Sequence, residues 1–232
     1  FGTTMSAIDA IVDEVVEMKA EMLLVLGAYD ADNIWHSEMR NYIWTRKMAN
    51  RSLKAEDLRD KFIENYFGAQ AASYIRAYCE DYDSYYSDND ANYPVKNVNE
   101  YYSRVIVSEH CTSLQRVLDA IAAVKNSAEL TEEQKNIYLA RLYRVQASSY
   151  TSLLYYFESY YKAATKDEKL MLGGEKSGLF GTSVSDAAAA KTVFISSFKE
   201  ICANAGITRC REGTDSGNTV ENFIENNIGK LF

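Results

Sequence analysis

The sequence predicts a mainly α protein, a multi-helix bundle, on three observations. Apolar residues recur at the spacing of amphipathic helices along most of the chain. A single proline, Pro94, interrupts 232 residues, and proline breaks helices because it lacks an amide donor and clashes with the preceding turn. Hydrophobic residues make up 47% of the chain, which excludes a disordered protein and is enough for a substantial core.

The first fifty residues contain the one candidate strand. Residues 6–20 have helical periodicity, and residues 22–28 form an apolar run without alternation, as expected of a strand buried on both faces. A polar loop then leads to helical periodicity over 35–48. A lone buried strand needs neighbours for its backbone groups, and no other segment of the chain is a convincing partner. We therefore predict that residues 1–50 are a helix-strand-helix unit that pairs with protein outside the chain, or else one longer helix.

Residues 51–232 are predicted to form an α-helical domain. The expected helices are 55–67, 69–86, 112–125, 132 to about 165, a helix capped at 185 or 186 that ends before 206, and 220–228. Gly68 and Gly206 are natural stops, because glycine adopts the left-handed conformation that ends helices. Thr131 and Gln134 form a capping box, in which each side chain accepts the other residue's free amide.

Three further segments carry no clear helical signal. Residues 87–99, which include the proline, and the glycine- and serine-rich residues 167–184 are predicted loops. The β-branched stretch 101–107 is compatible with helix or strand. Many of the eighteen tyrosines lie in helical stripes, where we expect them to fill the core with their hydroxyls at its wet edge.

Charge and hydropathy exclude two classes of partner. The chain has 25 Lys and Arg against 33 Asp and Glu, a net charge of −8, and no basic run that would bind nucleic acid. No apolar stretch reaches the roughly 18 to 20 residues that span a bilayer. The chain begins at Phe1 with neither a methionine nor a signal peptide, so we interpret it as a piece of a longer protein. The oligomeric state is not predicted.

Neither a cofactor nor a metal is predicted. The four cysteines contain no CxxC pair, and two histidines are too few to complete a convincing zinc site. Residues 173–178 lack the full phosphate-loop motif, and residues 88–99 lack the glycine and glutamate of a calcium loop. We predict buried free thiols, with two disulfides as the alternative. The cysteines are Cys79, Cys111, Cys202 and Cys210.

The candidate substrate-binding residues follow the predicted strand. They are Asp30, Asp32, Asn33, Trp35 and His36. Polar and aromatic groups at the C-terminal end of a buried parallel strand are where barrel enzymes hold substrates. The structural alternative is that Asp32 or Asn33 caps the next helix and Trp35 joins the core. No catalytic residue is assigned, because no nucleophile motif such as GxSxG is present.

Several short motifs carry a resemblance. They are Met39-Arg40-Asn41-Tyr42-Ile43, Ala49-Asn50-Arg51-Ser52-Leu53, Asp57-Leu58-Arg59-Asp60-Lys61-Phe62, Tyr66-Phe67-Gly68-Ala69-Gln70-Ala71-Ala72 with Ile75-Arg76-Ala77-Tyr78, and the tail 198–213. Together they resemble a bacterial glycoside hydrolase-like family, long described as a domain of unknown function. Some of its members are endo-β-N-acetylglucosaminidases that cut complex N-glycans. The chain departs from the family at 49–52, where members commonly have a Trp-Asn-Pro type turn.

The resemblance implies both a fold and an activity. Residues 1–50 would be the last helix, strand and helix of a (β/α)8 barrel, and the helical domain would follow it. Family chemistry is glycosidic hydrolysis by two carboxylates, which are expected outside this chain. The chain would be the catalytically incomplete helical portion of a bacterial protein that binds glycans outside the cell, in the periplasm or at the cell surface.

An alternative from another class is an independent helical module that binds a protein or a glycan through its tyrosines. It predicts tyrosine rings gathered in a solvent-open groove. An enzyme complete in these residues ranks third, because no competent catalytic constellation is present.

Overall fold

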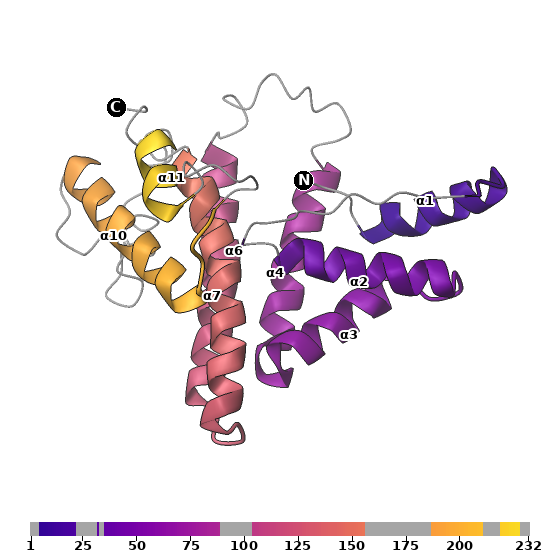
Figure 1. Cartoon of the computed structure of the whole chain (residues 1–232), viewed down its shortest axis with the longest axis horizontal. Helices are drawn as coiled ribbons and strands as arrows, with labels where there is room; N and C mark the ends of the chain where they lie inside the picture. The colour runs from indigo at the N-terminus through magenta and orange to yellow at the C-terminus, as the bar shows by residue number, and fades with distance from the viewer. Residues whose placement is uncertain are drawn as a thin grey trace.

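The computed structural model describes residues 5–21, 32, 35–88, 104–155, 187–210 and 219–227, and these residues form a bundle of helices (Figure 1). The helices are α1 (Met5–Glu17), α2 (Trp35–Ala49), α3 (Ala55–Phe67), α4 (Ala69–Asp88), α6 (Arg104–Asn126), α7 (Glu132–Tyr155), α10 (Ala187–Ala205) and α11 (Val220–Asn227). The mainly α fold is therefore confirmed. Within the described ranges, β pairing is limited to one antiparallel bridge between Arg209 and Thr219.

Part of the predicted organisation lies outside the described residues. This applies to the strand expected at 22–28, so the barrel remnant stays a prediction. The loop expected at 167–184 lies outside them as well. Helices α1 and α2, which precede residue 50, share a hydrophobic core with helices that follow it. The division of the chain at residue 50 also remains a prediction.

The antiparallel pair α6 and α7 forms the middle of the bundle (Figure 1). On one side α4 packs against α6, α3 packs against α4, and α2 and α1 pack against α3. On the other side α10 packs against α7, and α11 contacts both. Fully buried members of the main core are Ile8, Ile43, Ala55, Ile63, Phe67, Ala71, Ile75, Val117, Ala120, Val124, Leu142 and Val145.

Helix α1 ends three residues earlier than its hydrophobic pattern predicts. Lys19 has a φ of 53°, the left-handed conformation that ends helices. Its amide donates to the Val16 carbonyl (3.0 Å), and the Ala20 amide donates to the Val15 carbonyl (3.1 Å). These two bonds satisfy the last carbonyls of the helix, so residues 18–20 belong to a Schellman turn.

Local signals at three other helix ends are confirmed. Gly68 separates α3 from α4, as predicted. Thr131 and Gln134 form the reciprocal capping box, with the Thr131 amide 2.9 Å from Gln134 Oε1 and the Gln134 amide 3.2 Å from Thr131 Oγ1. Gly206, with a φ of 66°, ends α10. These signals are readable because each depends on residues within one turn of the helix end.

The end of α4 differs from the prediction, and the start of α6 resolves a stretch that the sequence left open between helix and strand. Helix α4 continues to Asp88, two residues past the predicted end at residue 86. Helix α6 begins at Arg104, so residues 104–107 of the ambiguous stretch are helical. The predicted loop from residue 89 onward lies outside the described residues.

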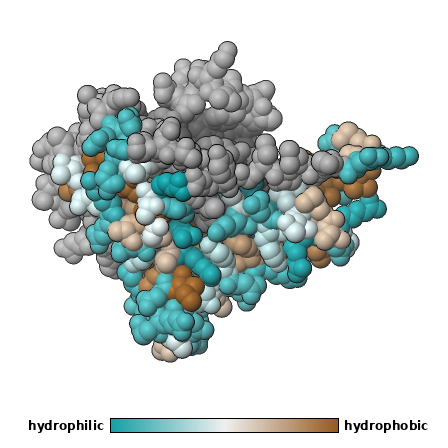
Figure 2. Space-filling model, in the orientation of Figure 1, coloured by the Kyte–Doolittle hydropathy of each residue, from teal (hydrophilic) through white to brown (hydrophobic). Residues whose placement is uncertain are grey.

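The tyrosines with described side chains pack in or against the core, as predicted, but the hydroxyls of Tyr78 and Tyr150 are buried and do not lie at its wet edge. Tyr78 and Tyr150 are buried, and the others are half-buried against the main core. The half-buried tyrosines are Tyr42, Tyr66, Tyr74, Tyr138 and Tyr143. On the coloured part of the face in Figure 2, hydrophilic residues predominate, and hydrophobic residues are exposed at the α1 end and in smaller patches elsewhere. None of the described helices is long and apolar enough to span a bilayer.

Candidate functional site

The structure describes two side chains of the predicted site, those of Asp32 and His36. Trp35 is the first residue of α2, but its side chain lies outside the described part, as do Asp30 and Asn33. The predicted cluster of five is therefore tested only through these two residues, and the binding role of all five stays a prediction.

Asp32 holds the segment that follows α10. Its Oδ2 accepts hydrogen bonds from the Thr208 amide (2.6 Å), the Thr208 hydroxyl (2.7 Å) and the Arg209 amide (2.8 Å). The Asp32 amide donates in turn to the Arg209 carbonyl (3.2 Å). Asp32 thus satisfies backbone groups of a segment 176 residues away, a tether that is invisible to local sequence patterns.

These hydrogen bonds keep the Asp32 carboxylate ionised. Partial burial opposes its charge, but the bonds from the Thr208 hydroxyl and the backbone amides of Thr208 and Arg209 outweigh that opposition and lower the pKa of Asp32 below 3.8. An ionised carboxylate only accepts hydrogen bonds. At neutral pH, Asp32 can therefore bind a hydroxyl or an amide, but it cannot serve as a general acid.

His36 lies at the start of α2 and faces the other way, toward α4. Its ring centroid is 6.5 Å from that of Tyr78, a buried residue of α4. Burial, together with the positive charge of Arg40 one turn along α2, lowers the pKa of His36 to about 3. A base with so low a pKa is nearly unprotonated and weakly basic at neutral pH. His36 is therefore suited to packing and hydrogen bonding rather than to proton transfer.

A second polar cluster beside the start of α2 was not predicted from the sequence. The Tyr66 hydroxyl donates to Glu38 Oε2, which ties the end of α3 to the first turn of α2. Arg141 of α7 stacks over the Tyr66 ring, with its guanidinium carbon 4.2 Å from the ring centroid, and donates to the Tyr66 carbonyl (2.7 Å). Burial and the bond to Glu38 raise the pKa of Tyr66 to about 12, so its hydroxyl stays protonated.

The structure explains why the Tyr66-Phe67-Gly68 motif has a glycine at position 68. Its φ is 85°, and a Cβ built there would lie 2.7 Å from Cε2 of Tyr138. Phe67 is fully buried beside it. Part of the motif that carries the family resemblance is therefore a close-packed helix corner. The sequence shows the corner through its glycine, but it contains no local signal for Glu38 and Arg141 as partners of Tyr66.

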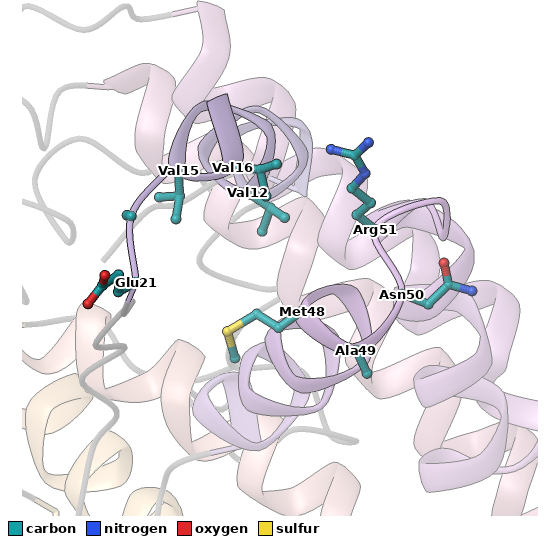
Figure 3. A pocket seen from close by; sticks show the side chains of 9 residues that line it. Val12, Val15, Val16, Glu21, Met48, Ala49, Asn50 and Arg51 are labelled. Carbon is teal, nitrogen blue, oxygen red and sulfur yellow. The ribbon is translucent and has the colours of Figure 1, made fainter. Parts of the chain in front are cut away.

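A groove of about 550 Å³, with both apolar and polar lining residues, lies at the opposite end of α2 from His36. Val12, Val15 and Val16 of α1 line one side, and Met48 of α2 lies across from them (Figure 3). The remaining lining residues are Ala20, Glu21, Ala49, Asn50 and Arg51. The groove is thus separated from His36 by nearly the length of α2, about 20 Å for fifteen residues.

In the described ranges, no three His, Cys, Asp or Glu side chains gather in a way that would hold a metal ion. Asp32 supplies a fixed anionic acceptor, and His36 supplies a neutral ring. A comparison of the chain with protein-family models, curated proteins and solved structures finds no match.

Proposed function

We propose that this chain is the helical portion of a glycoside hydrolase-like protein that acts on complex glycans. In this proposal the loop before α2 forms one edge of the sugar site, and the catalytic carboxylates lie outside the chain. The observation that carries the proposal is the bonding of Asp32, in that loop, to Thr208 and Arg209. These two residues belong to the tail that resembles the family's closing segment.

The tether supports a binding role because it orients a charged acceptor in advance. The three hydrogen bonds that the carboxylate receives from described residues go to Oδ2. We assign Oδ1 to a sugar hydroxyl, since an ionised carboxylate has acceptor capacity on both oxygens. We assign the Trp35 indole to the apolar face of the sugar ring, the usual use of a large amphipathic ring at a binding edge. Asp30 and Asn33 would supply further polar contacts.

Binding is tested with the tryptophans, of which the chain has two. Trp44 is buried in the core. Because the chain has two tryptophans, the Trp44→Phe variant leaves Trp35 as its only indole. We expect a complex N-glycan to change the fluorescence of this variant in a saturable way. The additional substitution Asp30→Ala should weaken binding, whereas Asp13→Ala on the exposed face of α1 should not. A titration without any saturable change, in a variant that folds normally, would contradict the sugar site.

Catalytic incompleteness is tested separately. We expect the chain to release no glycan from a glycoprotein that carries complex N-glycans, because the two carboxylates required for hydrolysis are assigned elsewhere. Mass spectrometry of the released sugars measures this directly. Release by the purified chain would contradict the assignment, even if the binding experiment succeeds.

The alternative tyrosine-lined binding module has less support. It requires tyrosine rings in an open groove, but the seven tyrosines with described side chains all pack in the core or at its edge. No tyrosine is among the described residues that line the groove between α1 and α2. We therefore base the proposal on the Asp32 loop.

A further inference from the structure

The end of α10 carries two cysteines that the proposed function does not use. Cys202 is buried in the last turn of the helix, and Cys210 is half-buried in the segment after Gly206. Both are free thiols, and their side chains share a hydrogen bond. We propose that Cys202 and Cys210 are a redox site, a dithiol that a small disulfide such as oxidised glutathione converts to an intramolecular disulfide.

The backbone between the two cysteines turns back on itself. The Gly206 amide donates to the Ala203 carbonyl (3.1 Å), and the Ile207 amide donates to the Cys202 carbonyl (2.8 Å). This Schellman turn reverses the chain at the end of α10, with Gly206 in the left-handed conformation. Residue 210 is thereby directed back toward the helix, so the contact between the thiols follows from the turn.

Contacts beyond the turn keep Cys210 in place. Asp32 holds the two residues that precede it, Thr208 and Arg209. The Thr208 carbonyl accepts from the Val220 amide at the start of α11 (3.2 Å). A disulfide requires sulfur atoms about 2.05 Å apart and closely placed Cβ atoms. Two thiols already in hydrogen-bonding contact on a fixed backbone need only a small approach to meet this requirement.

The two thiols differ in a way that suits stepwise oxidation. The hydrogen bond from Cys202 lowers the pKa of Cys210, although burial and the nearby carboxylates of Asp32 and Glu221 oppose the shift. The same hydrogen bond and burial raise the pKa of Cys202. Cys210 is also the more exposed of the two. Because the thiolate is the attacking species, Cys210 is the first nucleophile and Cys202 the resolving thiol.

The oxidation proceeds in two balanced exchanges. The Cys210 thiolate attacks one sulfur of oxidised glutathione, which forms a mixed disulfide and releases one glutathione thiolate. Cys202 loses its proton and attacks the Cys210 sulfur, which forms the protein disulfide and releases the second glutathione. The protein gives up two electrons and two protons, and one glutathione disulfide becomes two glutathione thiols. The bridge closes the loop 202–210 and fastens the segment that Asp32 holds.

The test counts thiols in the native chain. The protein is equilibrated in glutathione buffers of increasing oxidised fraction, acid-quenched, denatured and alkylated, and its intact mass is measured. We expect four alkylated cysteines in reducing buffer, two in oxidising buffer, and four again after dithiothreitol. Trypsin cuts after Lys199, Arg209 and Arg211, so the bridge should appear as peptide 200–209 linked to the dipeptide Cys210-Arg211.

Matched variants identify the pair. Cys210→Ser should keep all three remaining thiols alkylatable in oxidising buffer. Cys202→Ala should stop at the mixed disulfide, with one glutathione on Cys210 and two alkylatable thiols, whereas Cys79→Ala and Cys111→Ser should still lose two. Cys210→Ser is the more informative of the first two, because a half-buried position tolerates the change better than the buried Cys202. Four free thiols at every glutathione ratio, or a bridge that includes Cys79 or Cys111, would overturn the proposal.

Discussion

The start of α3 and the segment after α10 are each held by an aspartate from a distant part of the chain, but the two joints are built differently. At α3, the Asp9 carboxylate accepts from the Ala55 amide (3.2 Å) and pairs with the Lys47 ammonium (2.7 Å). After α10, the Asp32 carboxylate is bound by a hydroxyl and two backbone amides. Lys47 is only 2% exposed, so the first joint contains a buried cation.

The buried Lys47 indicates that the Asp9 joint is the one that supports the fold. Lys54 precedes α3 but makes no side-chain cap, so Asp9 supplies the acceptor that the local sequence lacks. Lys47 also donates to the carbonyls of Arg51 and Leu53, which fixes the turn between α2 and α3. Among the described residues, the Asp32 joint has no buried lysine that bridges several groups, as Lys47 does at the Asp9 joint. We expect the Asp9 joint to contribute more to the free energy of unfolding. We expect the Asp32 joint to open more easily, as binding loops must.

The largest effect is expected at the far end of α3. Gly68→Ala places a side chain at a φ of 85° and against the Tyr138 ring, so we expect a loss of about 3 kcal/mol in the free energy of unfolding. Gly206→Ala is the matched control at the end of α10. It also has a positive φ, but no atom lies within 4 Å of the added Cβ, and about 1 kcal/mol is expected. Urea denaturation measures both, and equal losses would contradict the tighter packing assigned to the α3 end.

The next effect compares the aspartates directly. Asp9→Asn keeps an acceptor for the Ala55 amide but removes the anion beside Lys47, so we expect a loss of about 2 to 3 kcal/mol. In a Lys47→Met background the same substitution should cost much less, since the buried cation is gone. A double-mutant cycle in urea measures this coupling. A coupling near zero would show that Lys47 is held by the carbonyls alone.

A pH dependence is expected from His36, the other residue of the predicted site whose side chain the structure describes. Its pKa in the folded state is about 3, below the ordinary 6.5, so the unfolded state binds more protons between these values. Stability should therefore fall as the pH falls, by about 2 kcal/mol between pH 7 and pH 5. His36→Gln should remove this slope, and His110→Gln should leave it in place. An unchanged slope in His36→Gln would contradict the neutral imidazole assigned to His36.

The smallest effect is expected at Asp32. Asp32→Asn should cost about 1 kcal/mol at neutral pH, because the amide oxygen can still accept part of the bonding from Thr208 and Arg209. The pKa of Asp32 is lowered in the folded state, so its contribution is present above its ordinary pKa of 3.8 and is lost as the pH falls below that value. The difference between wild type and Asp32→Asn should therefore shrink in acid. A loss as large as that of Asp9→Asn would make the two joints equivalent.

The sequence predicts the features that depend on neighbouring residues. The capping box at Thr131 and the stops at Gly68 and Gly206 are each written within a few positions, and the structure confirms them. The end of α1 is not readable, because Lys19 adopts a conformation that its side chain does not favour. Helix periodicity predicts the element type of each described helix except at the start of α6, where the sequence of residues 101–107 is compatible with helix or strand.

The candidate site is less predictable because its contacts join distant segments. The sequence allows Asp32 to cap the helix that follows it, but its carboxylate accepts hydrogen bonds from Thr208 and Arg209. Asp9 and Ala55 are 46 residues apart, and Glu38 and Tyr66 are 28 apart. Such pairs follow from how the helices pack, and no spacing rule within one segment specifies them. His36 could be named as a candidate, but its neutral state depends on burial beside Arg40 and could not be predicted.

The tether from Asp32 to Thr208 also has a consequence for the order of folding. It connects positions 176 residues apart, so closing that loop costs chain entropy that is recovered only after the intervening helices have packed. The contact should form after the folding transition state. Weakening it would then accelerate unfolding and leave the refolding rate almost unchanged. Early separation of the α10 end from the predicted loop would be the first event of unfolding, while α3, α4, α6 and α7 remain assembled.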